Sequence, residues 1–136
     1  MSKYTASSHA TYNVGYHIIF CTKYRYRLLR YGAKRTLKTL IAEAAINLGI
    51  TIRAMETMPE HVHLFVTASP SLPVQRIVKN LKGYTSYYLR MQYAYLRKYP
   101  SLWTRSYFVE TVGHISEKTV THYIERQKSN ALSSPC

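Results

Sequence analysis

The stretch that decides the fold is ITIRAMETMPEHVHLFVTA, residues 50–68. Its first part is rich in β-branched residues and alternates between apolar and polar side chains. Met58, Pro59 and Glu60 then interrupt the pattern before HVHLFVTA resumes it. Such a pattern predicts two strands joined by a tight connection. We therefore expect a β-hairpin at the centre of the chain.

The segments on either side of this hairpin follow one another in a simple order. TYNVGYHIIFC, residues 11–21, alternates like a strand, and apolar residues spaced by three and four predict a helix from about Arg35 to Gly49. After the hairpin, the spacing from Ile77 to Tyr95 predicts a long helix that ends before Pro100, and SYFVETV, residues 106–112, predicts a fourth strand.

A last helix is expected to begin at Ser116, which can cap its free amides, with Ile115 and Val120 as a hydrophobic staple. The order β-α-β-β-α-β plus a terminal helix predicts an α+β fold of the ferredoxin-like, RRM-like split βαβ type. Both crossover helices then cover one face of an antiparallel sheet and leave the other face uncovered. With 136 residues, the chain is expected to form a single domain, 1–136, with tails at about 1–10 and 129–136.

The charge of the chain points to a polyanionic partner. Lys and Arg number 19 against six acidic residues, a net charge of +13, and 14 tyrosines are available to stack on bases. Charge for solubility alone and binding to a membrane surface are the alternatives. The chain has no Asp, and its glutamates are scattered, which argues against two-metal nucleases. We expect nucleic acid to contact Lys23, Arg25, Arg27, Arg30, Arg76, Lys79, Lys82 and Arg90.

The histidines of the hairpin form a candidate metal site. Alternate side chains of a strand share a face, so His61 and His63 point away from the face that carries Val62 and Leu64. Two imidazoles one pleat apart can chelate an ion. On spacing alone, an ordinary pair of surface histidines explains the motif as well.

Two polar residues of the last expected helix lie four positions apart and hence on one side of it. These are Tyr123 and Gln127. Tyr123 can be read as a nucleophile, or as a core or base-stacking tyrosine. Gln127 can be read as a ligand or as a solvated helix residue. The spacing does not decide between these interpretations.

Four separated motifs occur in order along the chain. They are YHIIFCTKYRYRLL from Tyr16, METMPEHVHLFV from Met55, LKGYTSYYLR from Leu81 and LWTRSYFVETVGHISEKTVTHYIERQ from Leu102. Together they resemble the IS200/IS605 family of transposases, the single-tyrosine members of the HUH group, and the resemblance extends over about residues 12–128.

The resemblance implies a role for each matching residue. His61 and His63 match the metal-binding histidines, Tyr123 the nucleophile and Gln127 a further metal ligand. Glu60 stands where many relatives carry Asp, and its role is left open. The resemblance also implies one Mg²⁺ or Mn²⁺ ion per site, single-stranded DNA with hairpin ends as substrate, and a homodimer whose active sites are assembled in trans.

The expected function is that of a DNA transposase that cleaves and rejoins single-stranded DNA at insertion-sequence ends. A tyrosine has an ordinary pKa of about 10, so it needs an activated phosphate to react through a 5′-phosphotyrosine intermediate. No P-loop or other nucleotide motif is present, and joining in this way needs none. The alternatives are an HUH nuclease that processes repetitive palindromes or replication origins, and a non-catalytic RNA-binding module.

The expected location is the cytoplasm of a prokaryotic cell. The N-terminus has no apolar signal segment, and no apolar run approaches the length that spans a bilayer. We therefore expect no membrane partner.

Overall fold

A computed structural model describes residues 13–112 of the chain. The described elements follow one another in the predicted order. They are β1 (Val14–Cys21), α1 (Ala33–Leu48), β2 (Thr51–Thr57), β3 (His61–Ala68), α2 (Val74–Gln92) and β4 (Phe108–Val112), with short 3-10 helices η1 (Lys23–Arg25) and η2 (Ala94–Lys98).

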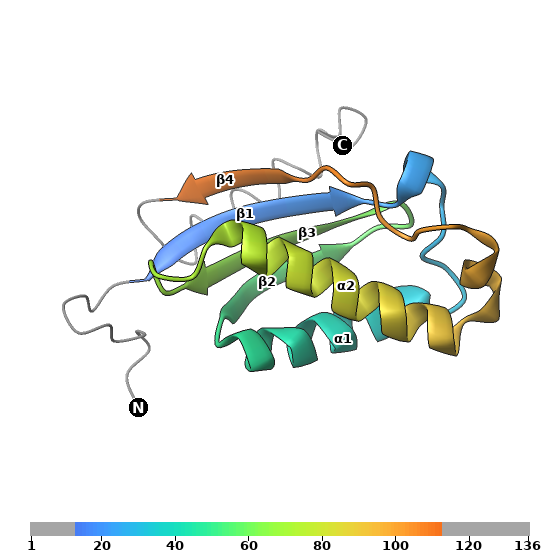
Figure 1. Cartoon of the computed structure of the whole chain (residues 1–136), viewed down its shortest axis with the longest axis horizontal. Coiled ribbons are helices and arrows are strands. Elements are labelled where there is room, and N and C mark those ends of the chain that lie inside the picture. Colours follow the sequence, from blue (N-terminus) through green and yellow to red (C-terminus); the bar gives the residue numbers. More distant parts are fainter. Residues whose placement is uncertain (1–12, 113–136) are drawn as a thin grey trace.

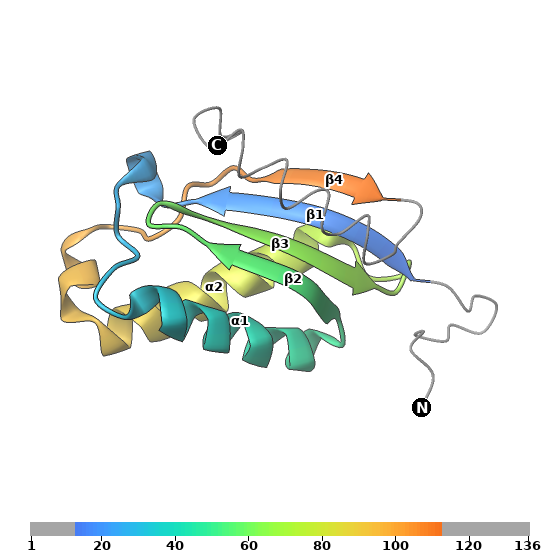
Figure 2. The same cartoon turned by 180° about the vertical axis from the view of Figure 1, so that it is seen from behind.

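The four strands form one antiparallel sheet in the order β2-β3-β1-β4. Figures 1 and 2 show α1 and α2 side by side on one face of this sheet. The predicted ferredoxin-like arrangement is therefore confirmed for the described residues. The expected terminal helix, with Tyr123 and Gln127, and both expected tails lie outside them.

The core lies between the sheet and the two helices. β3 contributes Val62, Leu64 and Val66 to it, as the alternation of HVHLFVTA predicts. Helix α1 adds Leu37 and Ile41 from its inner side. Each fully buried side chain of this kind contributes roughly 1.5–3 kcal/mol relative to an exposed one. The alternation therefore fixes which side chains of β3 point to the opposite face.

Helix α2 buries Ile77 and Leu81, with which its apolar series begins, but not all of the residues that continue the series. Leu81, Thr85 and Leu89 are buried, whereas Tyr88 and Met91 are 42% and 60% exposed. Thr85 is tolerated in the core because its hydroxyl donates to the Leu81 carbonyl and accepts a hydrogen bond from the Trp103 indole.

Among residues 13–112, no helix combines the length and the apolar character needed to cross a membrane.

The segment between β1 and α1, residues 22–32, has an unusual backbone. Tyr24, Arg25 and Tyr31 have φ angles of 58°, 56° and 57°, and Gly32 has a φ of 90°. Outside glycine, each left-handed residue costs roughly 1–2 kcal/mol. The segment is held in place by the backbone amide of Leu29, which donates to the Pro59 carbonyl at 2.9 Å. We call this segment the 22–32 loop.

Candidate active site

Two histidine side chains of β3 meet on the sheet face opposite the helices. Nε2 of His61 lies 2.8 Å from Nε2 of His63, and the two rings are edge to face with centroids 4.7 Å apart. Both side chains are buried, at 3% and 5% exposure. The two side chains therefore share one face of β3, as the strand alternation predicts, and their role as metal ligands stays a prediction.

Glu60, which precedes the pair, fixes which ring nitrogen of neutral His61 carries the hydrogen. Its Oε1 lies 2.8 Å from Nδ1 of His61, and its Oε2 lies 3.6 Å from the guanidinium of Arg27. A carboxylate only accepts hydrogen bonds, so Nδ1 of His61 carries the hydrogen. The lone pair of neutral His61 is then on Nε2, which points toward His63.

Burial keeps both imidazoles neutral at ordinary pH. It lowers the pKa of His63 from 6.5 to about 3, with smaller lowering effects from nearby His61 and His17. Burial also lowers the pKa of His61 and outweighs the hydrogen bond and the charge of Glu60, which raise it. The neutral imidazole is the form that binds a metal ion.

A third histidine lies beside the pair. His17 is fully buried on β1, and its ring stacks against His63 with centroids 6.0 Å apart. Its Nδ1 lies 3.9 Å from a carboxylate oxygen of Glu110 on β4. The sequence does carry a signal for His17: Tyr16, Ile18 and Phe20 alternate toward the core, so His17 has to face the other way.

The histidine pair fits two of the ligands of one ion. Two nitrogens at a right angle on an ion about 2.1 Å away would be about 3 Å apart, close to the observed separation. Within residues 13–112, no group of three or more His, Cys, Asp and Glu side chains could hold a metal. His17 is therefore a neighbour and not a third ligand in this part of the chain. Tyr123 and Gln127 cannot be placed, because they lie outside the described residues.

The eight cations expected to bind DNA fall into two groups, one on the 22–32 loop and one on α2. Two of those on α2 already have backbone partners. Lys82 donates to the carbonyls of Thr104 and Ser106 at 2.7 and 2.8 Å, and burial lowers its pKa to about 8. Arg90 donates to the Tyr99 carbonyl at 3.1 Å. DNA contact stays a prediction for all eight: Lys23, Arg25, Arg27, Arg30, Arg76, Lys79, Lys82 and Arg90.

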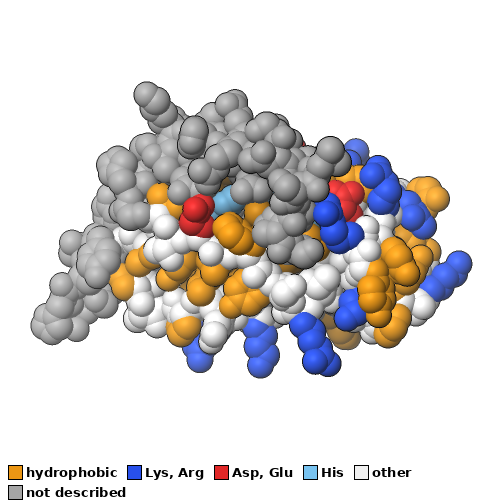
Figure 3. Space-filling model, turned by 90° about the horizontal axis from the view of Figure 1, so that it is seen from above, with side chains coloured by type: hydrophobic (Ala, Val, Ile, Leu, Met, Phe, Trp, Pro, Cys, Tyr) orange, Lys and Arg blue, Asp and Glu red, His pale blue; other side chains and the backbone are white. Residues whose placement is uncertain are grey.

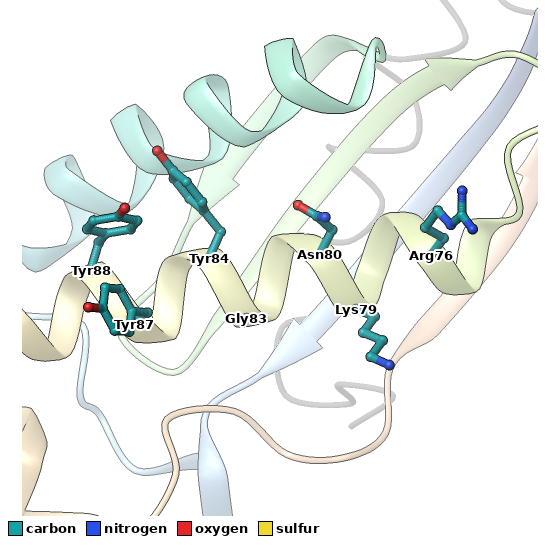
Figure 4. Close-up of a pocket in the computed structure, with 7 residues that line it drawn as sticks. All are labelled: Arg76, Lys79, Asn80, Gly83, Tyr84, Tyr87 and Tyr88. Carbon is teal, nitrogen blue, oxygen red and sulfur yellow. The ribbon is translucent and has the colours of Figure 1, made fainter.

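The two other predicted cations of α2 line a shallow groove on the helix layer. Figure 4 shows Arg76 and Lys79 at one end of this groove and Tyr84, Tyr87 and Tyr88 at the other. The Tyr84 hydroxyl donates to Glu43 of α1 at 3.0 Å. This α2 groove is on the opposite side of the sheet from the histidines, so it is separate from the candidate active site.

Comparison with known proteins identifies similar chains over nearly the whole length. A family model described as "Transposase IS200 like" matches residues 10–127. The chain is 34% identical to the ISDra2 transposase TnpA of Deinococcus radiodurans over 119 residues, which cover 85% of each protein. It is 32% identical over 136 residues to the transposase for insertion sequence element IS200 of Salmonella typhimurium, covering 94% of this chain and 89% of that protein.

Solved structures give the same picture. A crystal structure of a protein from Deinococcus radiodurans assigned as a transposase matches with a TM-score of 0.74 and 32% identity, covering 90% of this chain and 97% of the other. A REP-associated tyrosine transposase bound to a REP hairpin matches with a TM-score of 0.57 and 14% identity, covering 86% and 68%. At that identity, the second match shows a shared fold.

Proposed function

The chain belongs to the IS200-like transposases, and from this premise we propose that it cleaves and rejoins single-stranded DNA at insertion-sequence ends through Tyr123. The observation that carries the proposal is the convergence of the Nε2 atoms of His61 and His63 at 2.8 Å. Two neutral imidazoles whose nitrogens lie this close together are suited to binding one metal ion. Because they are buried, they would contribute little to a surface that only binds nucleic acid.

The ligands proposed for one Mg²⁺ or Mn²⁺ ion are His61, His63 and the amide oxygen of Gln127. All three are neutral, so they leave the charge of the ion undiminished. When bound, the ion supplies positive charge that makes a phosphate more electrophilic and offsets charge in the transition state. The chain's part is to present neutral nitrogens: burial favours the neutral form, and Glu60 fixes the hydrogen of His61 on Nδ1.

Tyr123 is proposed as the nucleophile. Its phenolic oxygen forms a bond to the scissile phosphorus while the bond from phosphorus to the 3′ oxygen breaks. The phenolic proton is balanced by the proton gained by the leaving 3′-OH. A second 3′-OH then attacks the 5′-phosphotyrosine, joins the strands and releases the tyrosine. The phosphotyrosine conserves the bond energy, so the exchange needs no nucleotide cofactor.

The proposed partner is single-stranded DNA with hairpin ends, and the proposed assembly is a homodimer with active sites formed in trans. A net charge of +13 supports the DNA partner. So does the structural neighbour that was solved with a REP hairpin.

The proposal is tested with labelled single-stranded element ends. Wild-type protein with Mn²⁺ should give a covalent protein–DNA adduct on a denaturing gel, and EDTA or Tyr123→Phe should abolish it. Tyr87→Phe, a change of an exposed tyrosine on α2, is the matched control and should leave the adduct intact. An adduct that persists in the Tyr123→Phe protein would overturn the assignment of the nucleophile.

A further inference from the structure

We propose that the 22–32 loop and the segment after α2 together form a stacking surface for unpaired bases, next to the histidine pair. The inference rests on the proposed function, because it takes the bound single strand to be the strand that is cut. The surface, which we call the aromatic end surface, is made by Tyr24, Tyr26, Tyr31, Tyr95 and Tyr99.

Three of the five tyrosines are exposed, Tyr95 and Tyr99 are half-buried, and each ring lies against at least one other ring of the set. Tyr24 and Tyr31 are 72% and 76% exposed, and Tyr26 is 49% exposed. The ring of Tyr26 lies 5.6 Å from that of Tyr24 and 5.9 Å from that of Tyr99, between centroids. Exposed apolar clusters of this kind on a soluble domain mark binding sites.

Positive charge is interleaved with these rings. The Lys23 ammonium lies 5.3 Å from the centre of the Tyr24 ring, and the Arg30 guanidinium lies 5.2 Å from the centres of both the Tyr31 and the Tyr95 rings. Figure 3 shows basic and hydrophobic side chains gathered at the end of the molecule that carries this loop. Rings for bases and cations for phosphates together are the combination that binds single-stranded nucleic acid.

The backbone holds this surface in a fixed shape. Tyr24 and Tyr31, which carry the most exposed rings, both have left-handed φ angles that a tyrosine rarely adopts. The Tyr95 hydroxyl lies 2.6 and 2.9 Å from the carbonyls of Leu28 and Arg30 and so ties the loop to η2. Strained residues held by their surroundings are typical of pre-organised binding sites.

The surface is joined directly to the histidine site. β1 ends at Cys21, which pairs with His61, and the next residue donates from its backbone amide to the Glu60 carbonyl at 2.9 Å. Arg27 of the loop lies 3.6 Å from the Glu60 carboxylate, which in turn bonds His61. Single-stranded DNA whose bases stack on the 22–32 loop would therefore lie close to the Nε2 atoms of His61 and His63.

The chemistry of the surface favours a single strand over a duplex. The faces of paired bases are covered by their neighbours in a duplex, so exposed rings add nothing to its binding, whereas cations bind both forms. The α2 groove offers the same residue types, tyrosine and basic residues, but it lies on the side of the sheet opposite the histidines. It therefore provides a matched comparison.

The test measures DNA binding without cleavage, in full-length Tyr123→Phe protein with EDTA at one fixed salt concentration. The probes are a fluorescent single-stranded oligonucleotide of mixed sequence and the same sequence as a duplex. The double variant Tyr24→Asn/Tyr31→Asn keeps a residue type that tolerates left-handed backbone. At 1–3 kcal/mol for each stacked base, it should bind the single strand about tenfold or more weakly and the duplex almost unchanged.

Two controls complete the test. Tyr24→Phe/Tyr31→Phe keeps the rings and should bind like the parent, and Tyr87→Gln in the α2 groove should also bind like the parent. The inference is overturned if the Asn variant binds the single strand as tightly as the parent. It is also overturned if Tyr87→Gln lowers the affinity for the single strand by as much as the Asn variant does, or if the Asn variant loses as much affinity for the duplex as for the single strand. The assay needs neither the nucleophile nor a metal, so its failure leaves the cleavage proposal standing, and the absence of an adduct leaves this inference standing.

Discussion

Oε1 of Glu60 lies 2.8 Å from Nδ1 of His61, and this contact decides which nitrogen of His61 is free to bind a metal. Neighbouring residues in a strand normally point to opposite faces. Glu60 is outside β3, in the turn before it, and from there its side chain can reach the ring that follows. A carboxylate that holds the second nitrogen of a ligand histidine fixes the ring and strengthens the ligand.

Removal of this contact should weaken metal binding without unfolding the protein. Partners of this kind are worth about 10–100-fold in metal affinity, so Glu60→Ala should lower the affinity for Mn²⁺ by that order in calorimetric titration. Glu60→Gln should lose less, because its amide oxygen still accepts from Nδ1. Glu43→Gln is the control, since Glu43 contacts Tyr84 on the helix layer. Equal Mn²⁺ affinity for Glu60→Ala and wild type would contradict a positioning role.

The buried His63 should make the metal-free protein less stable in acid. Its pKa is 6.5 in an unfolded chain and about 3 in the fold, so between these values the unfolded state binds more protons. The free energy of unfolding then rises with pH through this window and is unaffected by His63 above it. From pH 6.5 down to pH 5, the loss should reach roughly 2 kcal/mol.

Urea denaturation with EDTA at several pH values measures this effect. Other groups titrate in the same range, so the quantity to compare is the difference between wild type and His63→Gln. The wild-type free energy of unfolding should fall more steeply toward pH 5 than that of the variant. Parallel curves would show that His63 is not held neutral by the fold.

Much of the fold could be predicted because its signals are local. Alternation in HVHLFVTA fixes the two faces of β3, and Gly49 does end α1 in a left-handed conformation. The apolar spacing predicts helix α2 but not the exposure of Tyr88, because a tyrosine counts as apolar although its ring can lie at the surface. Thr85 could not be recognised as a core residue, because its partner Trp103 comes from a distant loop.

The candidate site was also predictable only where its signals are local. Strand alternation places His61 and His63 together, but their pairing with Glu60 and Arg27 depends on side-chain positions in a turn. The position of His17 beside His63 depends on the register between β1 and β3, in which Ile19 is opposite His63. The structural role of Lys82 depends on the path of the chain after η2.

Lys82 and Lys79 lie three residues apart on α2, but we expect their substitution to affect different properties. Loss of Lys82 should affect folding stability, and loss of Lys79 should affect DNA binding. Lys82→Met loses two hydrogen bonds and leaves the carbonyls of Thr104 and Ser106 without this partner, so it should lower the free energy of unfolding by about 1–3 kcal/mol. Exposed Lys79→Met should change it by less than about 0.5 kcal/mol. Its effect should appear in DNA binding, as a salt dependence about one unit shallower. An unchanged free energy of unfolding in Lys82→Met would contradict a stabilising role for these two hydrogen bonds.

A mixture of two inactive proteins should recover activity if the homodimer assembles its sites in trans. His61→Ala lacks a metal ligand and Tyr123→Phe lacks the nucleophile, so neither forms an adduct alone. In a heterodimer built in trans, one site receives an intact tyrosine from the first subunit and intact histidines from the second. Random exchange makes about half of the dimers heterodimers, each with one working site, so adduct formation should reach about a quarter of the wild-type level. Adduct formation is measured after the subunits have been mixed under conditions that allow exchange. No recovery in a mixture shown to contain heterodimers would mean that each subunit supplies its own tyrosine to its own histidines.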